Sequence, residues 1–317
     1  MVLSDRIHTY GQNLLQRYGE RVHKISLDAG IFTCPNRDGS KGVGGCTFCN
    51  NDSFSPSAGT GLDIDGQIAR ARERIAKRTR ARKFIAYFQA YTNTYAKVEQ
   101  LEALYRHALG QPDMVGLSVG TRPDCVSGKV LDLLERLRAR GLEVVLELGL
   151  QSANDATLER VNRGHTLAEY RATAKAARQR GIPVCAHLIV GLPGEGESDF
   201  HASLDTVLEI GVDGLKLHPL HVVKHTILAK QWRCGDYSPL ALDGYIRIAC
   251  DLIERTPAEV AFHRVTATAP EKVLLAPEWC GKKWIVLNGI EQELRRRDSR
   301  QGCLAGTPFL RELRHVA

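Results

Sequence analysis

Long apolar runs are missing from this 317-residue sequence. None approaches the roughly 20 apolar residues that a membrane-spanning helix requires, and the first residues lack the basic-then-apolar pattern of a secretory signal. We also find no internal repeats and no low-complexity segment. The sequence therefore predicts a cytoplasmic globular protein without a membrane partner, and its 43% hydrophobic and 25% charged residues are ordinary for that class.

A complete set of disulfides is excluded as well, because nine cysteines are an odd number. In a reducing cytosol, clustered cysteines more often bind metal or take part in catalysis. Six cysteines are scattered, and we interpret them as small buried side chains. They are Cys125, Cys185, Cys234, Cys250, Cys280 and Cys303. The other three, Cys34, Cys46 and Cys49, form one cluster.

A fourth cysteine is missing from this cluster, whereas a structural zinc site usually has four protein ligands. Eleven residues separate Cys34 from Cys46, and two separate Cys46 from Cys49. The longer spacer contains four glycines, which let backbone N–H groups turn toward a cluster. Three thiolates on a cubane iron–sulfur cluster would leave one iron open for a ligand. Spacing alone leaves two alternatives, a zinc site completed by His23 or His187 and a redox-active pair of Cys46 and Cys49.

Short runs rich in β-branched and aromatic residues alternate with amphipathic stretches after about residue 20. The runs predict strands at Val22–Leu27, Phe84–Phe88, Met114–Val119, Glu143–Leu150, Val184–Val190 and Gly214–Leu217. Six strand–helix units predict an α/β fold, a partial (β/α)6 barrel. We expect an N-terminal extension at 1–20, the core barrel at 21–238, and a C-terminal extension at 239–317 packed on it.

An unusual polar motif follows each predicted strand. These motifs are Cys34–Cys49, Gln89–Thr94, Thr121–Asp124, Gln151-Ser152, Gly191–Glu195 and His218–His221. Ligands of parallel α/β sheets bind at the carboxyl ends of the strands. The motifs therefore predict one shared active-site mouth. We interpret His218, His221 and His225 as substrate-facing or structural residues rather than a second metal site.

The formal net charge of +7 is concentrated in two places. Between Gln67 and Lys83 there are eight basic residues and one acid, and Arg295, Arg296, Arg297 and Arg300 form a second group. Such groups suit a phosphate backbone. A solvated helix face is the alternative interpretation.

The Cys-x-Phe-Cys motif, with a further cysteine just past the first strand, resembles the cluster motif of radical S-adenosylmethionine (SAM) enzymes. Its long form resembles a bacterial subfamily related to the catalytic subunit of Elongator, over about residues 10–302. Further matching motifs are Thr121-Arg122-Pro123-Asp124, Glu147–Ser152, Arg163-Gly164-His165-Thr166 and His187–Glu195. The resemblance implies that Cys34, Cys46 and Cys49 hold a [4Fe–4S] cluster. It also implies that SAM binds the open iron and is cleaved by one electron, from reduced flavodoxin or ferredoxin, to a 5′-deoxyadenosyl radical.

The resemblance also implies a set of SAM contacts. Phe48 lies near the adenine, with a plain core aromatic as the alternative. Gln89 and Thr92, in place of the usual Gly-Gly-Glu, bind the amino group. Arg122 suits the carboxylate because a guanidinium fits its fork, and an ion pair with Asp124 is the alternative.

Five further residues are expected near the nucleoside. Glu147 and Gln151 are expected to bind the ribose hydroxyls. Arg163 and His187 are second contacts, with a structural role as the alternative for His187. The turn containing Gly191 and Leu192 lets the backbone approach the adenine.

Elongator-type relatives act at C5 of the wobble uridine of tRNA, so the resemblance favours a modified uridine C5 substituent. The expected tRNA contacts are Arg70, Arg74, Lys77, Arg78, Arg295 and Arg296. Two other functions are kept open. One is a radical SAM enzyme for a small metabolite or a protein side chain, and the other is a zinc-stabilised binding protein without catalysis.

Overall fold

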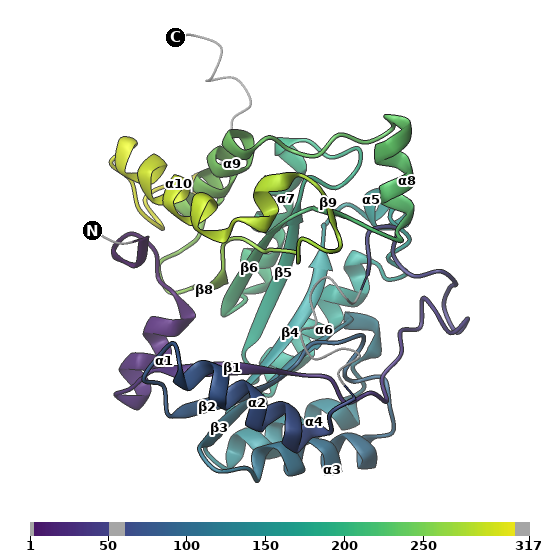
Figure 1. Cartoon of the computed structure of the whole chain (residues 1–317), viewed down its shortest axis with the longest axis vertical. Coiled ribbons are helices and arrows are strands. Elements are labelled where there is room, and N and C mark those ends of the chain that lie inside the picture. The colour runs from purple at the N-terminus through teal and green to yellow at the C-terminus, as the bar shows by residue number, and fades with distance from the viewer. Residues whose placement is uncertain (1–2, 51–60, 308–317) are drawn as a thin grey trace.

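The centre of the protein is a sheet of seven parallel strands, which a computed structural model describes over residues 3–50 and 61–307. The sheet curls into a half-barrel with helices on its outer face (Figure 1). Its strands stand in chain order: β1 (Val22–Leu27), β2 (Lys83–Phe88), β3 (Met114–Thr121), β4 (Glu143–Gln151), β5 (Val184–Val190), β6 (Gly214–Pro219) and β8 (Ala261–Arg264). Repeated strand–helix crossovers produce this order, so the predicted α/β half-barrel is confirmed.

Helices join the strands and cover the outer face of the sheet. In the barrel they are α2 (Ile64–Ala76), α3 (Val98–Leu109), η3 (Pro123–Cys125), α4 (Gly128–Ala139), α5 (Asp155–Arg160), α6 (Leu167–Gln179) and α7 (Glu197–Ile210). The other elements are η1 (Leu3–Asp5), α1 (Tyr10–Tyr18), β7 (Val222–Val223), α8 (Ile227–Cys234), α9 (Leu242–Arg255), β9 (Leu274–Ala276), η4 (Glu278–Gly281) and α10 (Lys283–Arg296). None of the helices in the described ranges is long and apolar enough to cross a membrane.

Side chains alternate between the two faces of the sheet. Leu117 on β3, Leu146 on β4 and Leu215 on β6 are fully buried in the hydrophobic core beneath the helices. Their neighbours Glu147 and Lys216 instead face the inside of the half-barrel and contact each other there. The barrel therefore has an apolar outer layer and a polar lumen.

The sheet has one strand more than the six predicted, because β8 from the C-terminal region pairs with β6. The N-terminal segment then reaches across to it. Thr9 forms a bridge to Phe262, the ring of Tyr10 stacks on His263 at 3.9 Å, and Arg6 Nη1 donates to Ser299 O at 2.7 Å. Contacts between α1 and both β1 and β8 join the two edges of the half-barrel. The domain boundaries predicted at residues 20 and 238 stay a prediction.

Candidate active site

A cavity of about 1220 Å³ occupies the lumen and the carboxyl ends of the strands. All three clustered cysteines line it, and so do residues of four other strand-end motifs; the sixth motif, Gly191–Glu195, contributes no lining residue. Burial, together with the nearby Cys46 and Cys34, raises the pKa of the Cys49 thiol to about 11, although Arg37 opposes the shift. The three sulfurs therefore lie within electrostatic reach of one another.

Two side chains direct N–H groups at the sulfur of Cys46. Asn36 Nδ2 lies 3.9 Å from it and Arg163 Nη1 lies 3.7 Å from it. Asn36 is fully buried and also donates to the carbonyl of Asn162. Gly164 has φ of +71°, and a Cβ there would collide with the Asn36 amide, so a side chain at this position would displace it. The absence of a side chain at Gly164 thus leaves room for the Asn36 amide beside the Cys46 thiol.

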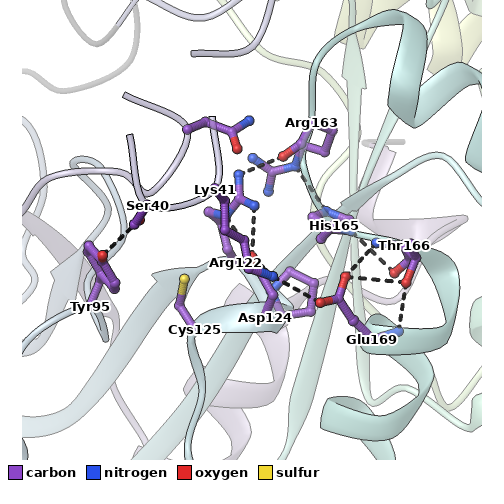
Figure 2. Close-up of polar contacts among 12 residues, drawn as sticks. Ser40, Lys41, Tyr95, Arg122, Asp124, Cys125, Arg163, His165, Thr166 and Glu169 are labelled. Carbon is purple, nitrogen blue, oxygen red and sulfur yellow. Dashed lines mark hydrogen bonds and ion pairs between the residues drawn. The ribbon is translucent and has the colours of Figure 1, made fainter. Parts of the chain in front are cut away.

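The eleven-residue spacer between Cys34 and Cys46 is anchored by charge (Figure 2). The ammonium of Lys41 lies 2.9 Å from Asp124 and 2.9 Å from Glu169. The side chain of Asp124 is buried and accepts hydrogen bonds from Nε and Nη2 of Arg122, at 3.0 and 2.8 Å. Although burial opposes it, these cations lower the pKa of Asp124 to about 2. The spacer is therefore tied to the helical segments that follow β3 and β4, η3 and α6.

A second set of contacts fixes the rest of the spacer. The hydroxyl of Tyr95 donates to Ser40 Oγ at 2.9 Å, as Figure 2 shows. Asn162 Nδ2 donates to the carbonyls of Gly45 and Val43, at 2.8 and 3.2 Å. Together with Lys41, these bonds connect the spacer to segments that follow three consecutive strands, β2, β3 and β4.

We predict that Lys41→Met weakens iron retention without unfolding the protein. The ammonium is partly exposed, so its pairs with Asp124 and Glu169 are worth only about 1 kcal/mol. Loss of iron to a chelator should then be roughly fivefold faster, measured by absorbance after anaerobic reconstitution. Lys175→Met, on the exposed face of α6, is the matched control. Equal rates for the two variants would contradict an anchoring role.

The structure brings most of the predicted SAM contacts to the cavity. Phe48, Gln89, Thr92, Gln151, Arg163 and His187 all line it. Gln151 has φ of +76° at the end of β4, and a Cβ on Gly149 would lie 2.7 Å from both the Gln151 and the Arg163 side chains. Gly149 therefore allows these two side chains to lie against the strand. Their roles toward SAM stay predictions.

Four predicted contacts are placed differently. Arg122 lines the cavity, but its guanidinium is occupied by Asp124 and by the carbonyl of Arg163, at 2.6 Å. This is the alternative interpretation that the sequence offered. Gly191 and Leu192 do not line the cavity, and Leu192 packs in a small core with Phe48 at its edge. The fourth, Glu147, lies beneath the cavity wall.

Glu147 is the centre of a buried polar network. Its side chain is fully buried and contacts the ammonium groups of Lys24 and Lys216, Ser118 Oγ at 2.6 Å and His187 Nε2 at 2.9 Å. Burial alone would raise the pKa of Glu147, but the charges of Lys216 and Lys24 hold it well below its usual range. Both carboxylate oxygens of Glu147 are bonded to these protein partners. The geometry therefore does not support the predicted contact of Glu147 with the ribose hydroxyls of SAM.

The lumen contains one functional candidate that sequence reasoning missed, Lys216, and one that it named, His218. Burial lowers the pKa of Lys216 to about 8, and its ammonium also donates to Tyr87 OH at 2.9 Å. His218 Nε2 is buried and has no hydrogen-bond partner among the described residues. A charged residue at an alternate position of an apolar strand, such as Lys24 or Lys216, was the signal that could have revealed this network.

The residues present fit a cluster with three protein ligands. Three thiols of one loop are soft ligands of the kind that iron–sulfur clusters use. N–H groups aimed at a ligating sulfur, as from Asn36 and Arg163, are a usual second layer around such clusters. A parallel half-barrel with this loop at its mouth defines a class of α/β enzymes that bind a metal cluster at the carboxyl edge of the sheet.

Comparison with known proteins identifies the family. The radical SAM superfamily model matches residues 34–207, and the Radical_SAM C-terminal domain model matches residues 212–296. Protein YhcC of Escherichia coli (strain K12) is 48% identical over 310 residues, which cover 98% of this chain and 99% of that protein. The chain belongs to the radical SAM superfamily, whose members bind a [4Fe–4S] cluster and SAM.

Two more distant proteins are similar to this chain. A tRNA uridine(34) acetyltransferase of Dehalococcoides mccartyi (strain CBDB1) is 29% identical over 234 residues, 68% of this chain and 49% of that protein. A solved structure of the archaeal Methanocaldococcus infernus Elp3 with an N-terminal deletion has a TM-score of 0.65 at 16% identity, covering 89% of this chain and 65% of that one. The second likeness concerns the fold alone.

Proposed function

We propose that this radical SAM enzyme modifies tRNA at the C5 substituent of the wobble uridine. The observation that carries the proposal is the charge of the cavity that contains the three cysteines. Seven cationic side chains line it, Lys24, Arg37, Arg122, Arg163, Lys216, Arg264 and Lys283. Glu147 and Asp124 neutralise part of the charge of Lys24, Lys216 and Arg122 from behind the cavity wall. The other four cations face one acidic lining residue, Glu271. Such a surface attracts a polyanion. The D. mccartyi relative, a tRNA uridine(34) acetyltransferase by name, supports the same substrate class.

In this proposal Cys34, Cys46 and Cys49 hold the cluster, and Phe48, Gln89, Thr92 and Gln151 hold SAM. When bound, the cluster and SAM together supply one-electron cleavage that yields a 5′-deoxyadenosyl radical. The electron comes from a reduced flavodoxin or ferredoxin in the cytoplasm. Asn36 and Arg163 direct N–H groups at Cys46 and offset its negative charge. The enclosed lumen orients the substrate and excludes water from the reacting centre.

The basic helix predicted to bind tRNA lies away from the mouth. Arg70 and Arg74 on α2, and Lys77 and Arg78 just after it, are exposed. Because α2 leads from the cysteine loop into the start of β2, it runs antiparallel to the strands. Arg78 therefore lies toward the amino ends of the strands. These residues can contact only parts of tRNA that are distant from the modified base.

The second basic group is largely paired within the protein. Arg296 Nε lies 2.8 Å from Glu293, and Arg295 Nη1 lies 3.9 Å from Glu291. Arg297 is held by Asp251 at 2.6 Å. We therefore assign to Arg295 and Arg296 a smaller contribution to tRNA binding than the cavity cations make.

The proposal predicts tRNA binding that weakens steeply with salt. Each neutralised phosphate adds about −0.9 to the slope of log affinity against log salt in duplexes, so a few contacts give about tenfold or more between 50 and 200 mM salt. Fluorescence anisotropy with unmodified tRNA measures this slope. Arg74→Glu with Arg78→Glu should lower the affinity modestly and reduce the slope. Wild-type protein that binds no tRNA at low salt, or binds it independently of salt, would disprove the proposal and favour a small metabolite or a protein side chain.

A further inference from the structure

The first turn of α10 exposes two large apolar side chains. Trp284 is 70% exposed and Ile285 is 46% exposed. The buried face of the same helix consists of Val286, Ile290 and Leu294, which pack in the core. Trp284 is therefore directed away from the core, and its presence on the surface is not explained by packing.

Cations lie at the start of α10 beside this tryptophan. Lys282 and Lys283 are exposed, and the Lys283 ammonium lies 5.7 Å from the centre of the Trp284 ring. Arg264, exposed at the end of β8, is close enough that its charge joins burial in lowering the pKa of Lys283. Within the described residues, none of these three cations forms a salt bridge to a carboxylate. They are thus available to an external anion.

This surface is continuous with the active-site cavity. Lys283, Arg264 and Leu287 line the same cavity as the three clustered cysteines. In Figure 1, α10 lies over the same end of the sheet as β8 and β6. A polymer that contacts the first turn of α10 can therefore place one of its units in the lumen.

We propose that Trp284, Lys282, Lys283 and Arg264 form a docking surface for single-stranded RNA beside the mouth. The inference rests on the proposed function and specifies how RNA is held. The Trp284 ring stacks on an unpaired base, and the three cations bind the phosphates on either side of it. A neighbouring nucleotide, unstacked from its strand, enters the cavity so that its base can react. Loop nucleotides fit this surface because duplex bases are covered on both faces.

An aromatic ring and several cations side by side favour RNA over an acidic protein. A base uses the ring face and its phosphate uses the ammonium groups at the same time. On α2, by contrast, the described exposed side chains near Arg74 are charged or small. The α2 arginines offer phosphate contacts alone, so we assign base contact to α10.

The test uses the reconstituted full chain and an unmodified anticodon stem-loop RNA as the probe. Trp284→Leu removes the stacking ring but keeps an apolar side chain, and it should weaken binding about tenfold or more, whereas Trp284→Phe should retain most of the affinity. Lys282→Glu with Lys283→Glu should weaken binding by at least as much and flatten the salt dependence. Iron content and the midpoint of thermal unfolding check that each variant is folded. Arg74→Glu with Arg78→Glu is the matched charge control, and it should weaken binding only modestly.

Three outcomes overturn the inference and are distinguishable. Wild-type binding with no loss in Trp284→Leu overturns the docking surface while the proposed function stands. Absence of RNA binding by the wild type overturns both. If Trp284→Leu binds RNA normally but is no longer reduced by flavodoxin, while dithionite still reduces it, the surface binds the electron donor instead. Loss of affinity in Trp284→Leu and retention in Trp284→Phe support the inference.

Discussion

Replacing Cys46 with alanine should remove the iron and abolish 5′-deoxyadenosine formation. After anaerobic reconstitution we expect about four irons per chain in the wild type and close to none in the variant. Cys46 is buried, and Asn36 and Arg163 both direct N–H groups at its sulfur. No other cysteine among the described residues lines the cavity beside Cys34 and Cys49. Iron and acid-labile sulfide analysis, with chromatography of the nucleoside after adding dithionite and SAM, measures both effects.

Cys250→Ala is the matched control, since Cys250 is also buried but lies in α9, in the core away from the cavity. It should keep its iron and its activity, with at most a modest loss of stability. If Cys46→Ala retained a full complement of iron, the assignment of the three ligands would be wrong. If the wild type took up one zinc and no iron, the site would be structural.

Glu147→Gln should destabilise the protein by about 3–5 kcal/mol at pH 7, because it leaves buried charges without their counter-ion. Lys24 and Lys216 both contact this carboxylate, and Lys216 and Glu147 are each almost completely buried. Without the negative charge the two ammonium groups repel each other across the lumen. Urea unfolding followed by circular dichroism measures the loss.

The pH dependence of this difference has a definite sign. Since the folded pKa of Glu147 is depressed, its stabilisation is complete above the unfolded pKa of about 4.3 and is lost as the pH falls toward the folded pKa. The gap between wild type and Glu147→Gln should therefore narrow below about pH 4.5. Adding Lys216→Met to the variant removes one unpaired cation and should recover part of the stability. A double variant less stable than Glu147→Gln would contradict the charge argument.

Much of the fold followed from patterns that are local in the sequence. Six strands were predicted within a few residues because each is a short apolar run bounded by turn residues. The seventh, β8, was read as part of the C-terminal extension. It has only four residues, and its place beside β6 depends on a pairing that spans about fifty residues of chain. Local pattern carries no information on such a partner.

In the site, too, features local in the sequence were predicted and features that depend on distant partners were not. Cys34, Cys46 and Cys49 belong to one loop, and the structure places them in one cavity. Arg122 was assigned to SAM from its side-chain type. Its guanidinium is instead hydrogen-bonded to Asp124 and to the carbonyl of Arg163, which is distant in the sequence. Glu147 was expected to face SAM, but Lys24 and Lys216, from two other strands, enclose it. Side chains whose partners come from other strands could not be assigned from spacing.

The contact between the two ends of the chain has a consequence for synthesis on the ribosome. Arg6 and Ser299 lie 293 positions apart, and at about 5–20 residues per second the first waits roughly 15–60 s for the second to be translated. The spacer anchors at Asp124 and Glu169 emerge much sooner. The cysteine loop can therefore be assembled on the nascent chain while the edge between β1 and β8 is still open. Iron delivery during translation would meet an ordered loop in an unfinished barrel.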